Sequence, residues 1–583
     1  MKEKTLKSEK IKLILDDSRR LTGKSLLWDK PGAIIDVFVS GVDKNQVVER
    51  WLSCVQQLFN DVDWQTESSC YRVFEDGVSL AISAPLDALY AACELNEAAF
   101  QLTQNYLMAK QENEDYSFNN NEEYQAIVAQ LKQIIADEVN PSLMHLIAMA
   151  KFNNTPYLVD DDEFSLGYGS TVQCWNINAL PDPNNINWSQ YHNIPLALVT
   201  GTNGKSTSVR IMSEIFKAAG KCCGVTSTDF IRVGDNIIDH GDYSGPSGAR
   251  MLLRHQDAQV AILEVARGGI LRRGLPIDHA DAALITNVAE DHLGQYGINS
   301  VTALAQAKAV VAKALTKGTL VLNADDANLV ALAPTLSATI CWFSLSENNQ
   351  ILTHHKSQGG AICFVRQQML IYCDLLGHES KIISVNDIPM TFNGAAKHNI
   401  LNALGAIALA KSLDVSNNAI TSALQSFSSN VDENPGRGNQ FEIGNAKVIM
   451  DFAHNVHSME AMVSTAENMT ATHKLIMISH AGDRSDQEII NMTKSALKLK
   501  PALIVAAEIK EYLRCRKLGE ISALITKTAI ASGMEPNKVM FADDPCDGTN
   551  KIIAQLKEGD LALLMVLSDR DKVVELLKKQ ATK

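Results

Sequence analysis

The chain has 583 residues, 46% of them hydrophobic and 21% charged, and a chain of this length is expected to form three or four soluble globular domains. Its formal net charge of −14 argues against nucleic-acid and anionic-membrane partners, because both require clustered Lys and Arg. The N-terminal residues MKEKTLKSEK lack the apolar core of a signal peptide and no apolar run is long enough to cross a bilayer, so we expect a cytoplasmic protein.

Strand-like and helix-like patterns alternate over residues 1–165, which predicts an N-terminal α+β domain. Within it, residues 112–123 are polar and rich in asparagine, which is typical of a mobile loop. Residues 166–193 are predicted to be a linker, because they contain Pro181, Pro183 and many asparagines. The expected strands of this region are 33–39 and 78–82, and the expected helices are 46–59, 86–108 and 124–136.

Residues 194–431 follow a βα rhythm, which predicts a central domain with a parallel sheet covered on both faces. Short β-rich runs in 350–392 predict an antiparallel extension of that sheet. Cys222 and Cys223 fall in an expected strand and are interpreted as reduced core residues. The strands are expected at 194–199, 222–226, 259–265, 281–287, 318–323 and 338–343, and the helices at 205–219, 300–315 and 396–413.

Residues 432–583 are predicted to form a second, smaller, Rossmann-like α/β domain. Gly444-Asn445 separates two strand-like runs, a pattern that favours a hairpin turn. Strands are then expected at 474–479, 501–507, 537–541 and 560–566, with helical segments between them. The fold class predicted for the whole chain is therefore α/β with three domains.

The segment VTGTNGKSTS, residues 199–208, follows an apolar strand and precedes a helical pattern. A glycine loop between a strand and a helix directs backbone N–H groups and the helix dipole at phosphates. Gly201 and Gly204 let the backbone approach closely, Lys205 can reach the terminal phosphates, and Ser206 offers a hydroxyl to Mg²⁺. The loop therefore predicts a nucleoside triphosphate site, which also includes Thr202, Asn203 and Thr207.

Polar residues also end the two following strands of the predicted sheet. Glu264 lies at the end of AQVAILEV, and Asn287 occupies the same place in DAALITNV, five residues before His292. The carboxyl ends of parallel strands share one crevice, so these side chains are expected beside the glycine loop. Each residue alone has an ordinary structural interpretation, and their convergence on the loop favours function.

At these residues the chain resembles the Mur ligase superfamily, which includes peptidoglycan-precursor ligases, folylpolyglutamate synthase and the C-terminal half of cyanophycin synthetase. The segments ARGGILRRG, DHLG and GDRSD are most similar to the cyanophycin-synthetase branch. That branch carries an ATP-grasp domain between its N-terminal and Mur-like parts, but here the gap is shorter than the roughly 50 residues that a domain needs. The matching motifs include GTNGKST, Glu264, Asn287-x-x-x-Asp-His292, AQA-Lys308, NADD at 323–326, His398-Asn-x-x-Asn402, PG-Arg437 and Asp451-FA-His454-Asn455.

The resemblance implies an ATP-dependent carboxylate–amine ligase that works through an acyl phosphate and releases ADP and phosphate. It implies two Mg²⁺ ions, one held by Ser206 and Glu264 and the other by His292. Lys308 would be the lysine that reacts with CO₂ to give a carbamate. By the same resemblance Asn402 would contact adenine, and Arg437 and Asp451 would contact phosphate and ribose.

The substrates would be amino-acid-like or peptide-like small molecules, such as an Asp side chain as the carboxylate and Arg or Lys as the amine. The resemblance puts the carboxylate donor at the N-terminal domain and the amine at the C-terminal domain. Alternatives are a folylpolyglutamate-type ligase and a non-catalytic or regulatory partner of a separate ATP-grasp enzyme; a homo-oligomer is expected. Candidate residues for substrate are His454, Asn455, Asp483, Arg484, Arg514 and Arg516.

Overall fold

The N-terminal part of the chain folds around a four-stranded antiparallel sheet of order β1-β2-β4-β3. The computed structural model describes residues 10–112, 122–514 and 516–581, so most of the loop expected at 112–123 lies outside the described residues. The elements are β1 Lys12–Leu21, β2 Gly32–Ser40, α1 Lys44–Asp61, β3 Ser69–Phe74, β4 Gly77–Ser83, α2 Leu89–Gln111, α3 Glu122–Glu138 and α4 Pro141–Phe152.

The segment predicted to be a linker is folded. A three-stranded antiparallel sheet forms from β5 Tyr157–Val159, β6 Glu163–Leu166 and β7 Gln173–Asn176. Trp175, Trp188 and Tyr191 of the predicted linker pack against a buried cluster that includes Leu146 of α4. Its aromatic side chains, which the asparagine-rich composition obscures, attach this segment to the N-terminal part of the molecule.

The central sheet has eleven strands in the order β11-β10-β9-β12-β8-β13-β14-β15-β16-β17-β18. From β9 to β16 in this sheet order, each strand pairs with its neighbour in parallel, as the sequence predicted. The expected extension at 350–392 is confirmed, because β17 pairs antiparallel with both β16 and β18. The strands are β8 Leu196–Thr200, β9 Cys223–Thr226, β10 Phe230–Val233, β11 Asn236–His240, β12 Val260–Glu264, β13 Ala282–Ile285, β14 Thr319–Asn323, β15 Thr339–Ser344, β16 Ile362–Arg366, β17 Met369–Cys373 and β18 Glu379–Ser384.

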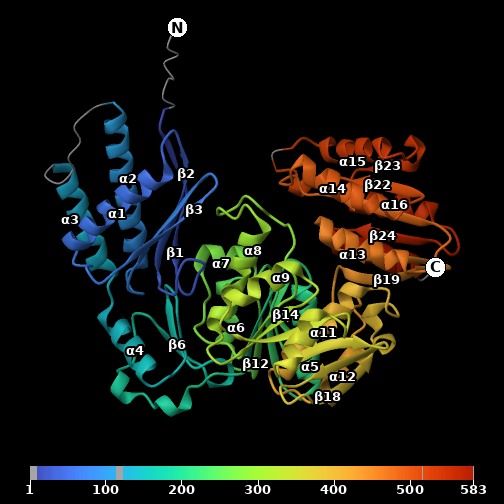
Figure 1. The fold of residues 1–583 in the computed structure, drawn as a ribbon, viewed down its shortest axis with the longest axis horizontal. Coiled ribbons are helices and arrows are strands. Elements are labelled where there is room, and N and C mark those ends of the chain that lie inside the picture. Colours follow the sequence, from blue (N-terminus) through green and yellow to red (C-terminus); the bar gives the residue numbers. More distant parts are fainter. Residues whose placement is uncertain (1–9, 113–121, 515, 582–583) are drawn as a thin grey trace, which may run out of the picture.

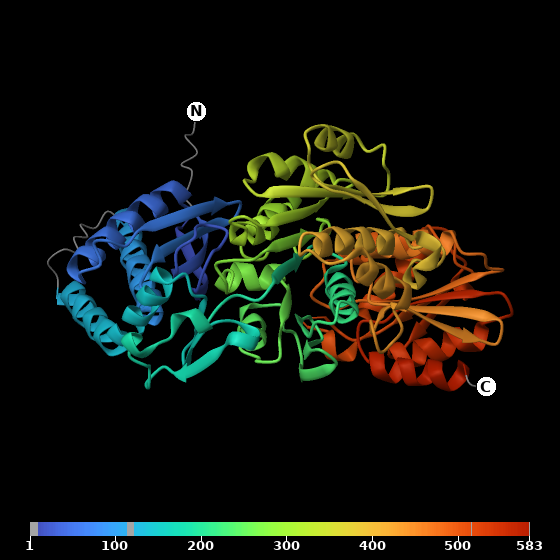
Figure 2. The same ribbon diagram turned by 90° about the horizontal axis from the view of Figure 1, so that it is seen from below.

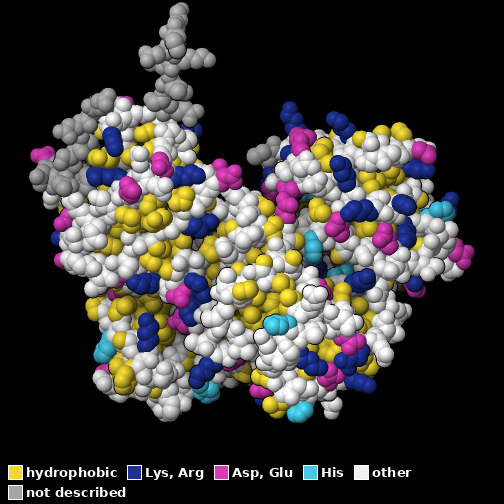
Figure 3. All heavy atoms as spheres, viewed as in Figure 1, with side chains coloured by type: hydrophobic (Ala, Val, Ile, Leu, Met, Phe, Trp, Pro, Cys, Tyr) yellow, Lys and Arg dark blue, Asp and Glu magenta, His cyan; other side chains and the backbone are white. Residues whose placement is uncertain are grey.

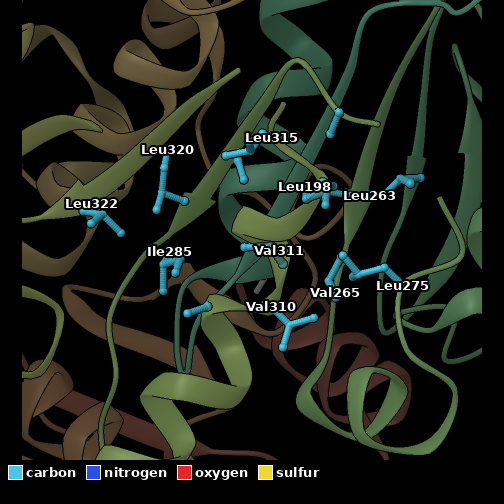
Figure 4. Packing of buried hydrophobic residues seen from close by; sticks show 14 of the residues in the cluster. Leu198, Leu263, Val265, Leu275, Ile285, Val310, Val311, Leu315, Leu320 and Leu322 are labelled. Atoms are coloured by element: carbon cyan, nitrogen blue, oxygen red, sulfur yellow. The ribbon is translucent and has the colours of Figure 1, made fainter. Parts of the chain in front are cut away.

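Successive residues of a strand point to opposite faces of the sheet. Both faces are buried here, because each is covered by its own hydrophobic cluster. In Figure 4, Leu198, Leu263, Ile285 and Leu320 lie on one face together with Val311 from the segment after α8. The opposite face packs on α5 and α11. The helices are α5 Lys205–Ala218, α6 Pro246–Leu253, α7 Arg267–Arg273, α8 Val301–Lys308, α9 Ala327–Leu332, α10 Gln350–Ser357, α11 Lys397–Lys411 and α12 Asn417–Ser426.

A six-stranded sheet of order β19-β20-β24-β21-β22-β23 forms the C-terminal part. The hairpin at Gly444-Asn445 is confirmed, because Ile443 pairs with Ala446 across it. The elements are β19 Arg437–Ile443, β20 Ala446–Asp451, α13 Val456–Glu467, β21 Lys474–Ser479, α14 Asp486–Leu497, β22 Leu503–Ala507, α15 Glu520–Ala531, β23 Val539–Ala542, α16 Pro545–Gln555, β24 Leu561–Met565 and α17 Arg570–Ala581. The predicted multi-domain α/β fold class is thus confirmed, whereas the predicted domain boundaries stay predictions.

The central sheet lies between the N-terminal and C-terminal parts in both ribbon views (Figures 1 and 2). Arg19 Nε donates to the carbonyl of Leu271, and Arg72 donates to the carbonyls of Tyr296 and Gly297. On the face drawn in Figure 3, side chains of both signs are interspersed and a notch separates the two outer parts. Within the described ranges no helix is both long enough and apolar enough to cross a bilayer.

Candidate functional site

The glycine loop connects β8 to α5 with backbone angles that favour glycine. Gly204, which caps α5, has φ of 86°, and Gly201 has φ of 148°. A Cβ on Gly201 would lie 1.9 Å from Thr286 Oγ1, and one on Gly204 would lie 2.3 Å from Asn402 Oδ1. Because no side chain caps α5, its first N–H groups are free to bind an anion.

Two residues at the end of β13 hold this loop in place. Asn287 Oδ1 accepts from the backbone N–H of Asn203 at 3.0 Å, and Asn287 Nδ2 donates to the carbonyl of Asn203 at 3.0 Å. Thr286 Oγ1 donates to the same carbonyl at 2.6 Å. β8 lies between β12 and β13, so the loop, Glu264 and Asn287 occupy the carboxyl ends of three adjacent strands.

A cavity of about 770 Å³ opens at these strand ends. Lys205 Nζ donates to the carbonyls of Gly201 and Thr202, both at 3.1 Å, and Ser206 Oγ lies 3.3 Å from Thr228 Oγ1. We call this space the reaction cavity. Of the residues predicted from the sequence, it is lined by Gly201, Thr202, Asn203, Gly204, Lys205, Ser206, Glu264, His292, Lys308, Arg437 and His454.

Glu264 is a buried carboxylate in this cavity. Its side-chain oxygens have no hydrogen-bond partner among the described residues. Burial raises the pKa of Glu264, while the nearby Lys205 ammonium and Ser206 hydroxyl oppose that rise. A buried carboxylate is costly unless it is paired or coordinates a metal, so Glu264 beside a serine hydroxyl fits a magnesium ligand set completed by phosphate oxygens and water.

Protein side chains alone do not form a metal cage here. No group of three or more His, Cys, Asp and Glu suited to a metal ion occurs in the described part of the chain. Mg²⁺ keeps several waters and is commonly bound by one or two protein groups together with substrate phosphates. The sparse ligand set therefore fits an ion that arrives with a nucleotide.

Lys308 ends α8 and is 4% exposed. Its Nζ donates to the carbonyl of Gly201 at 2.9 Å, which places the amine next to the glycine loop. Burial, reinforced by the positive charge of Lys205, lowers the pKa of Lys308 well below its usual value. Burial therefore shifts Lys308 toward the neutral amine relative to an exposed lysine, and the neutral amine is the nucleophilic form.

His292 lies in a charged cluster at the opening toward the C-terminal part. Arg484 Nη2 is 3.1 Å from His292 Nε2, and Arg484 Nη1 is 3.3 Å from Asp291 Oδ1. Burial lowers the pKa of His292 despite the neighbouring Asp291, which favours the neutral imidazole, the form that binds metal ions. A cation on His292 Nε2 would take the position that the guanidinium of Arg484 now occupies.

A second, narrower cavity of about 110 Å³ lies on the other side of the loop, between α11 and the C-terminal part. Asn402 Nδ2 donates to Asn399 Oδ1 at 3.2 Å on its wall. Burial raises the pKa of Asp451 to about 6, against the effect of Arg437, and lowers that of His398 to about 4. Asn203, Gly204, Thr207, Asn402, Arg437 and Asp451 are the sequence-predicted residues that line it.

Some of the candidate substrate residues have structural partners. Asn455 caps α13 through the N–H of Ser458 and exchanges two 3.2 Å hydrogen bonds with Asn203 of the glycine loop. Arg516 donates to the carbonyls of Gly482 and Arg484. The described residues that line the two cavities at the glycine loop do not include Asn455, Asp483, Arg484, Arg514 or Arg516.

The sequence did not single out Asp229 and Arg570, which connect the central and C-terminal parts. Asp229 accepts from Arg210 of α5 at 2.5 Å and from Arg570 of α17 at 2.9 Å. Arg437 and Arg570 both lie over the ring of Phe452. Arg570 lies shortly after the parallel strand β24. The strand-end argument that predicted Glu264 could therefore also have predicted Arg570.

Comparisons with known proteins agree with the motifs. Residues 199–410 match the Mur ligase middle domain, and residues 436–565 match the Mur ligase, glutamate ligase domain. Cyanophycin synthetase of Trichormus variabilis is 37% identical over 336 residues, which are 57% of this chain and 37% of that protein. Cyanophycin synthetase of Geminocystis herdmanii is 34% identical over 377 residues, which are 64% of this chain and 42% of that protein.

The matched region thus spans well under half the length of these two relatives. The UDP-N-acetylmuramoyl-L-alanyl-D-glutamate–2,6-diaminopimelate ligase of Bacillus velezensis is 25% identical over 320 residues, 52% of this chain and 60% of that protein. Among solved structures, Escherichia coli FolC in complex with ADP aligns with a TM-score of 0.49 at 18% identity, over 67% of this chain and 90% of that chain.

Proposed function

The chain belongs to the Mur ligase family, and on this premise we propose that it is an ATP-dependent carboxylate–amine ligase. The observation that carries the proposal is the buried, unpartnered carboxylate of Glu264 in one cavity with Lys205, Ser206 and Lys308. A glycine loop alone would also suit a nucleotide switch. The half-buried Lys205, the buried Lys308 and the buried carboxylate of Glu264 around it are suited to phosphoryl transfer.

The proposed reaction has two steps. A donor carboxylate oxygen attacks the γ-phosphorus of ATP, the bond to the β-bridging oxygen breaks, and ADP leaves with an acyl phosphate remaining. The acceptor amine then attacks the acyl carbon, the carbon–oxygen bond to phosphate breaks, and the amine loses a proton as the amide forms. Activation is needed because oxide is a very poor leaving group, whereas phosphate is a good one.

The loop amides and Lys205 would neutralise phosphate oxygens and hold the γ-phosphate in line with the donor. Ser206 and Glu264 would hold one Mg²⁺, and His292 a second one. The ions would spread the charge that builds up on the attacking and leaving oxygens. Arg437 and Asp451, from the C-terminal side, would contact phosphate and ribose, with Asn402 at the adenine.

Lys308 is proposed to carry a carbamate formed by attack of its amine on CO₂. Its neutral form is favoured by burial and by Lys205, and only the neutral amine can make that bond. The product would replace an amine beside the metal site with an anionic oxygen ligand, which Mg²⁺ prefers.

The acceptor is proposed to be an amino acid, with Arg or Lys as first candidates, bound between the C-terminal residues and the reaction cavity. His454 lines that cavity, and Asp483, Arg484, Arg514 and Arg516 surround its approach in our proposal. A cytoplasmic homo-oligomer that works beside a separate ATP-grasp enzyme would suit this role. Cytoplasmic placement is supported by the need for ATP and by the described cysteines, which are all free.

The test is phosphate release by the purified chain over a matrix of carboxylates and amines, with mass spectrometry of the products. We expect one or more pairs to stimulate release and to yield an amide. Lys205→Ala and Glu264→Gln should lower the stimulated rate at least 100-fold. Lys217→Ala, on the exposed end of α5 and paired with Asp235, is the matched control and should keep the wild-type rate.

Two alternatives have distinct outcomes in the same assay. A folylpolyglutamate-type ligase would respond to a pteroate donor with glutamate rather than to amino-acid pairs. A non-catalytic partner would bind ATP, yet no pair would raise phosphate release above the level of the Lys205→Ala variant. Either result would contradict the proposed amino-acid ligase.

A further inference from the structure

The helix that follows the glycine loop, α5, carries a fully buried arginine. Arg210 is 0% exposed, and its guanidinium donates to Asn434 Oδ1 at 2.6 Å and to Asp229 Oδ2 at 2.5 Å. It also lies over the ring of Phe230. A buried guanidinium is costly unless it is paired and hydrogen-bonded. The partners of Arg210 therefore help to fix the position of α5, whose first residues belong to the glycine loop.

Both hydrogen-bond partners of Arg210 lead from α5 to the C-terminal part. Asn434 lies in the segment that connects α12 to β19, and its Nδ2 donates to Thr207 Oγ1 of α5 at 3.3 Å. Asp229 lies in the turn between β9 and β10, and its Oδ1 accepts from Arg570 Nη2 of α17 at 2.9 Å. The carboxylate of Asp229 thus joins a helix of the central part to a helix of the C-terminal part. We call these two contacts of Asp229 the carboxylate bridge.

The carboxylate bridge is largely shielded from water. The side chain of Asp229 is 11% exposed, and that of Arg570 is 31% exposed. Burial raises the pKa of Asp229, but the positive charges of its arginine neighbours outweigh that effect and hold this pKa below the usual value of an aspartate. Removing one member of a shielded ion pair leaves the other charge without compensation, which is strongly unfavourable. The bridge is therefore suited to holding the two parts together.

The bridge also determines how the C-terminal part meets the reaction cavity. Arg570 and Arg437 both line that cavity. Their guanidinium carbons lie over the same ring, that of Phe452, at 5.3 Å and 4.9 Å from its centre. Because the two arginines pack on one ring, a contact that fixes Arg570 against α5 also limits where Arg437 enters the cavity.

We propose that Asp229 and Arg570 are positioning residues, which hold the C-terminal part against α5 and so place Arg437 at the phosphates. This proposal rests on the proposed ligase function, in which Arg437 contacts phosphate. The bridge consists of protein groups alone, so it acts before nucleotide binds as well as afterwards. Docking of the C-terminal part would then depend on an ion pair of the chain itself.

A direct contact between Arg570 and the nucleotide is the competing explanation, because Arg570 lines the reaction cavity. The two explanations differ in whether the effect of Arg570 requires Asp229. A double-mutant cycle separates them, since residues that act through one contact have non-additive effects.

The first measurement is small-angle X-ray scattering of the full chain without nucleotide. Arg570→Gln and Asp229→Asn should each increase the radius of gyration, because the C-terminal part is released, and Arg570→Lys should stay close to the wild type. Lys572→Gln removes an exposed charge of the same helix, paired with Asp569, and as the matched control should leave the radius unchanged. Circular dichroism checks that each variant is folded. Equal radii for wild type and a folded Arg570→Gln would overturn the proposal.

The second measurement is kcat for a substrate pair that the phosphate-release assay identifies. Arg570→Gln and Asp229→Asn should each lower kcat at least about tenfold, and Arg570→Lys should restore most of it. In the Asp229→Asn background, Arg570→Gln should cause no further loss. Equal fold losses in both backgrounds would show a direct contact with the nucleotide and would overturn the proposal. Scattering needs no substrate, so a failure of docking and a failure of the proposed ligase function are distinguishable.

Discussion

At the scale of single residues, the site is built from ionisable groups that the fold buries without an ion pair. Glu264 has no hydrogen-bond partner in the described chain, and the Lys308 amine has only a carbonyl. Such groups reduce stability, and proteins retain them chiefly where chemistry requires them. The sequence predicted both residues, but only the structure showed that they are unpaired.

Replacing Lys308 separates stability from function. In the folded state its pKa lies below the value of an unfolded lysine, so the unfolded chain binds more protons and wild-type stability rises with pH in the window between the two pKa values. Lys308→Met should therefore raise the free energy of unfolding at pH 7 by about 1–3 kcal/mol, and with it the thermal midpoint, while abolishing ligase activity.

Differential scanning calorimetry checks the midpoint, and phosphate release checks the activity. The exposed Lys317→Met is the matched control and should change neither. A Lys308→Met protein that is less stable than wild type would contradict the idea that this amine is buried at a cost.

Asp451 gives a pH-dependent prediction. Its folded pKa is about 6, above the usual 3.8, so the folded state binds the extra proton and stability is lost as pH rises from about 4 to 6. The Asp451→Asn variant has no carboxyl group to titrate at this position, so it does not lose this stability as the pH rises. The difference in unfolding free energy between variant and wild type should grow by roughly 2–3 kcal/mol over that range and then stay constant. Urea unfolding at several pH values measures it, and a flat difference would contradict the assigned shift.

At the scale of elements, hydrophobic periodicity predicted the central and C-terminal strands well. These strands are buried on both faces, for example Leu196–Thr200 and Leu561–Met565, and continuous apolar runs are an unambiguous signal. β1 and β3 were missed because they are edge strands with mostly exposed or half-buried residues. Their apolar pattern was too weak to detect.

The candidate site was predictable where a motif fixes the backbone and less so where the fold brings distant segments together. The position of Glu264 at a strand end predicted that it lies beside the loop. The hydrogen bonds between Asn287 and Asn203 could be identified only from the structure. Arg516, which the sequence suggests for substrate, donates to backbone carbonyls and pairs with Asp486 at 2.7 Å, so its role toward substrate stays a prediction. Long-range partners of this kind leave no local trace in the sequence.

The start of α13 tests whether the C-terminal part supports the glycine loop. Asn455→Ala removes a helix cap, worth about 1 kcal/mol, together with the contacts to Asn203. Asp544→Ala removes only a cap, that of α16. We expect ADP affinity, measured by calorimetry, to fall several-fold in the first variant alone. Equal affinities in both variants would show that the contact does not shape the nucleotide site.

At the scale of the whole molecule, the outer parts both touch the segment that carries Asp291 and His292. Arg484 reaches it from the C-terminal side, and Arg72 reaches Tyr296 and Gly297 from the N-terminal side. The central sheet supplies the glycine loop, and both neighbouring parts contact the segment that follows Asn287. Activity should therefore depend on residues far from the glycine loop.

Arg72→Ala tests this dependence. Loss of its two carbonyl contacts should loosen the 291–297 segment and lower kcat about tenfold, because small displacements of catalytic groups are costly. ATP affinity should stay unchanged. Lys30→Ala, an exposed residue of the same part that bonds to Ser68, should behave as wild type. A normal kcat in Arg72→Ala would mean that the N-terminal part does not position the segment.

The most direct measurement of the central claim follows the oxygen atoms of the donor. With both carboxylate oxygens of the donor labelled with ¹⁸O, attack on the γ-phosphorus carries one labelled oxygen into the released phosphate. The account predicts one ¹⁸O per phosphate in ³¹P NMR or mass spectrometry, and no such phosphate with Glu264→Gln. Amide product accompanied by unlabelled phosphate would contradict an acyl phosphate and the function proposed for this site.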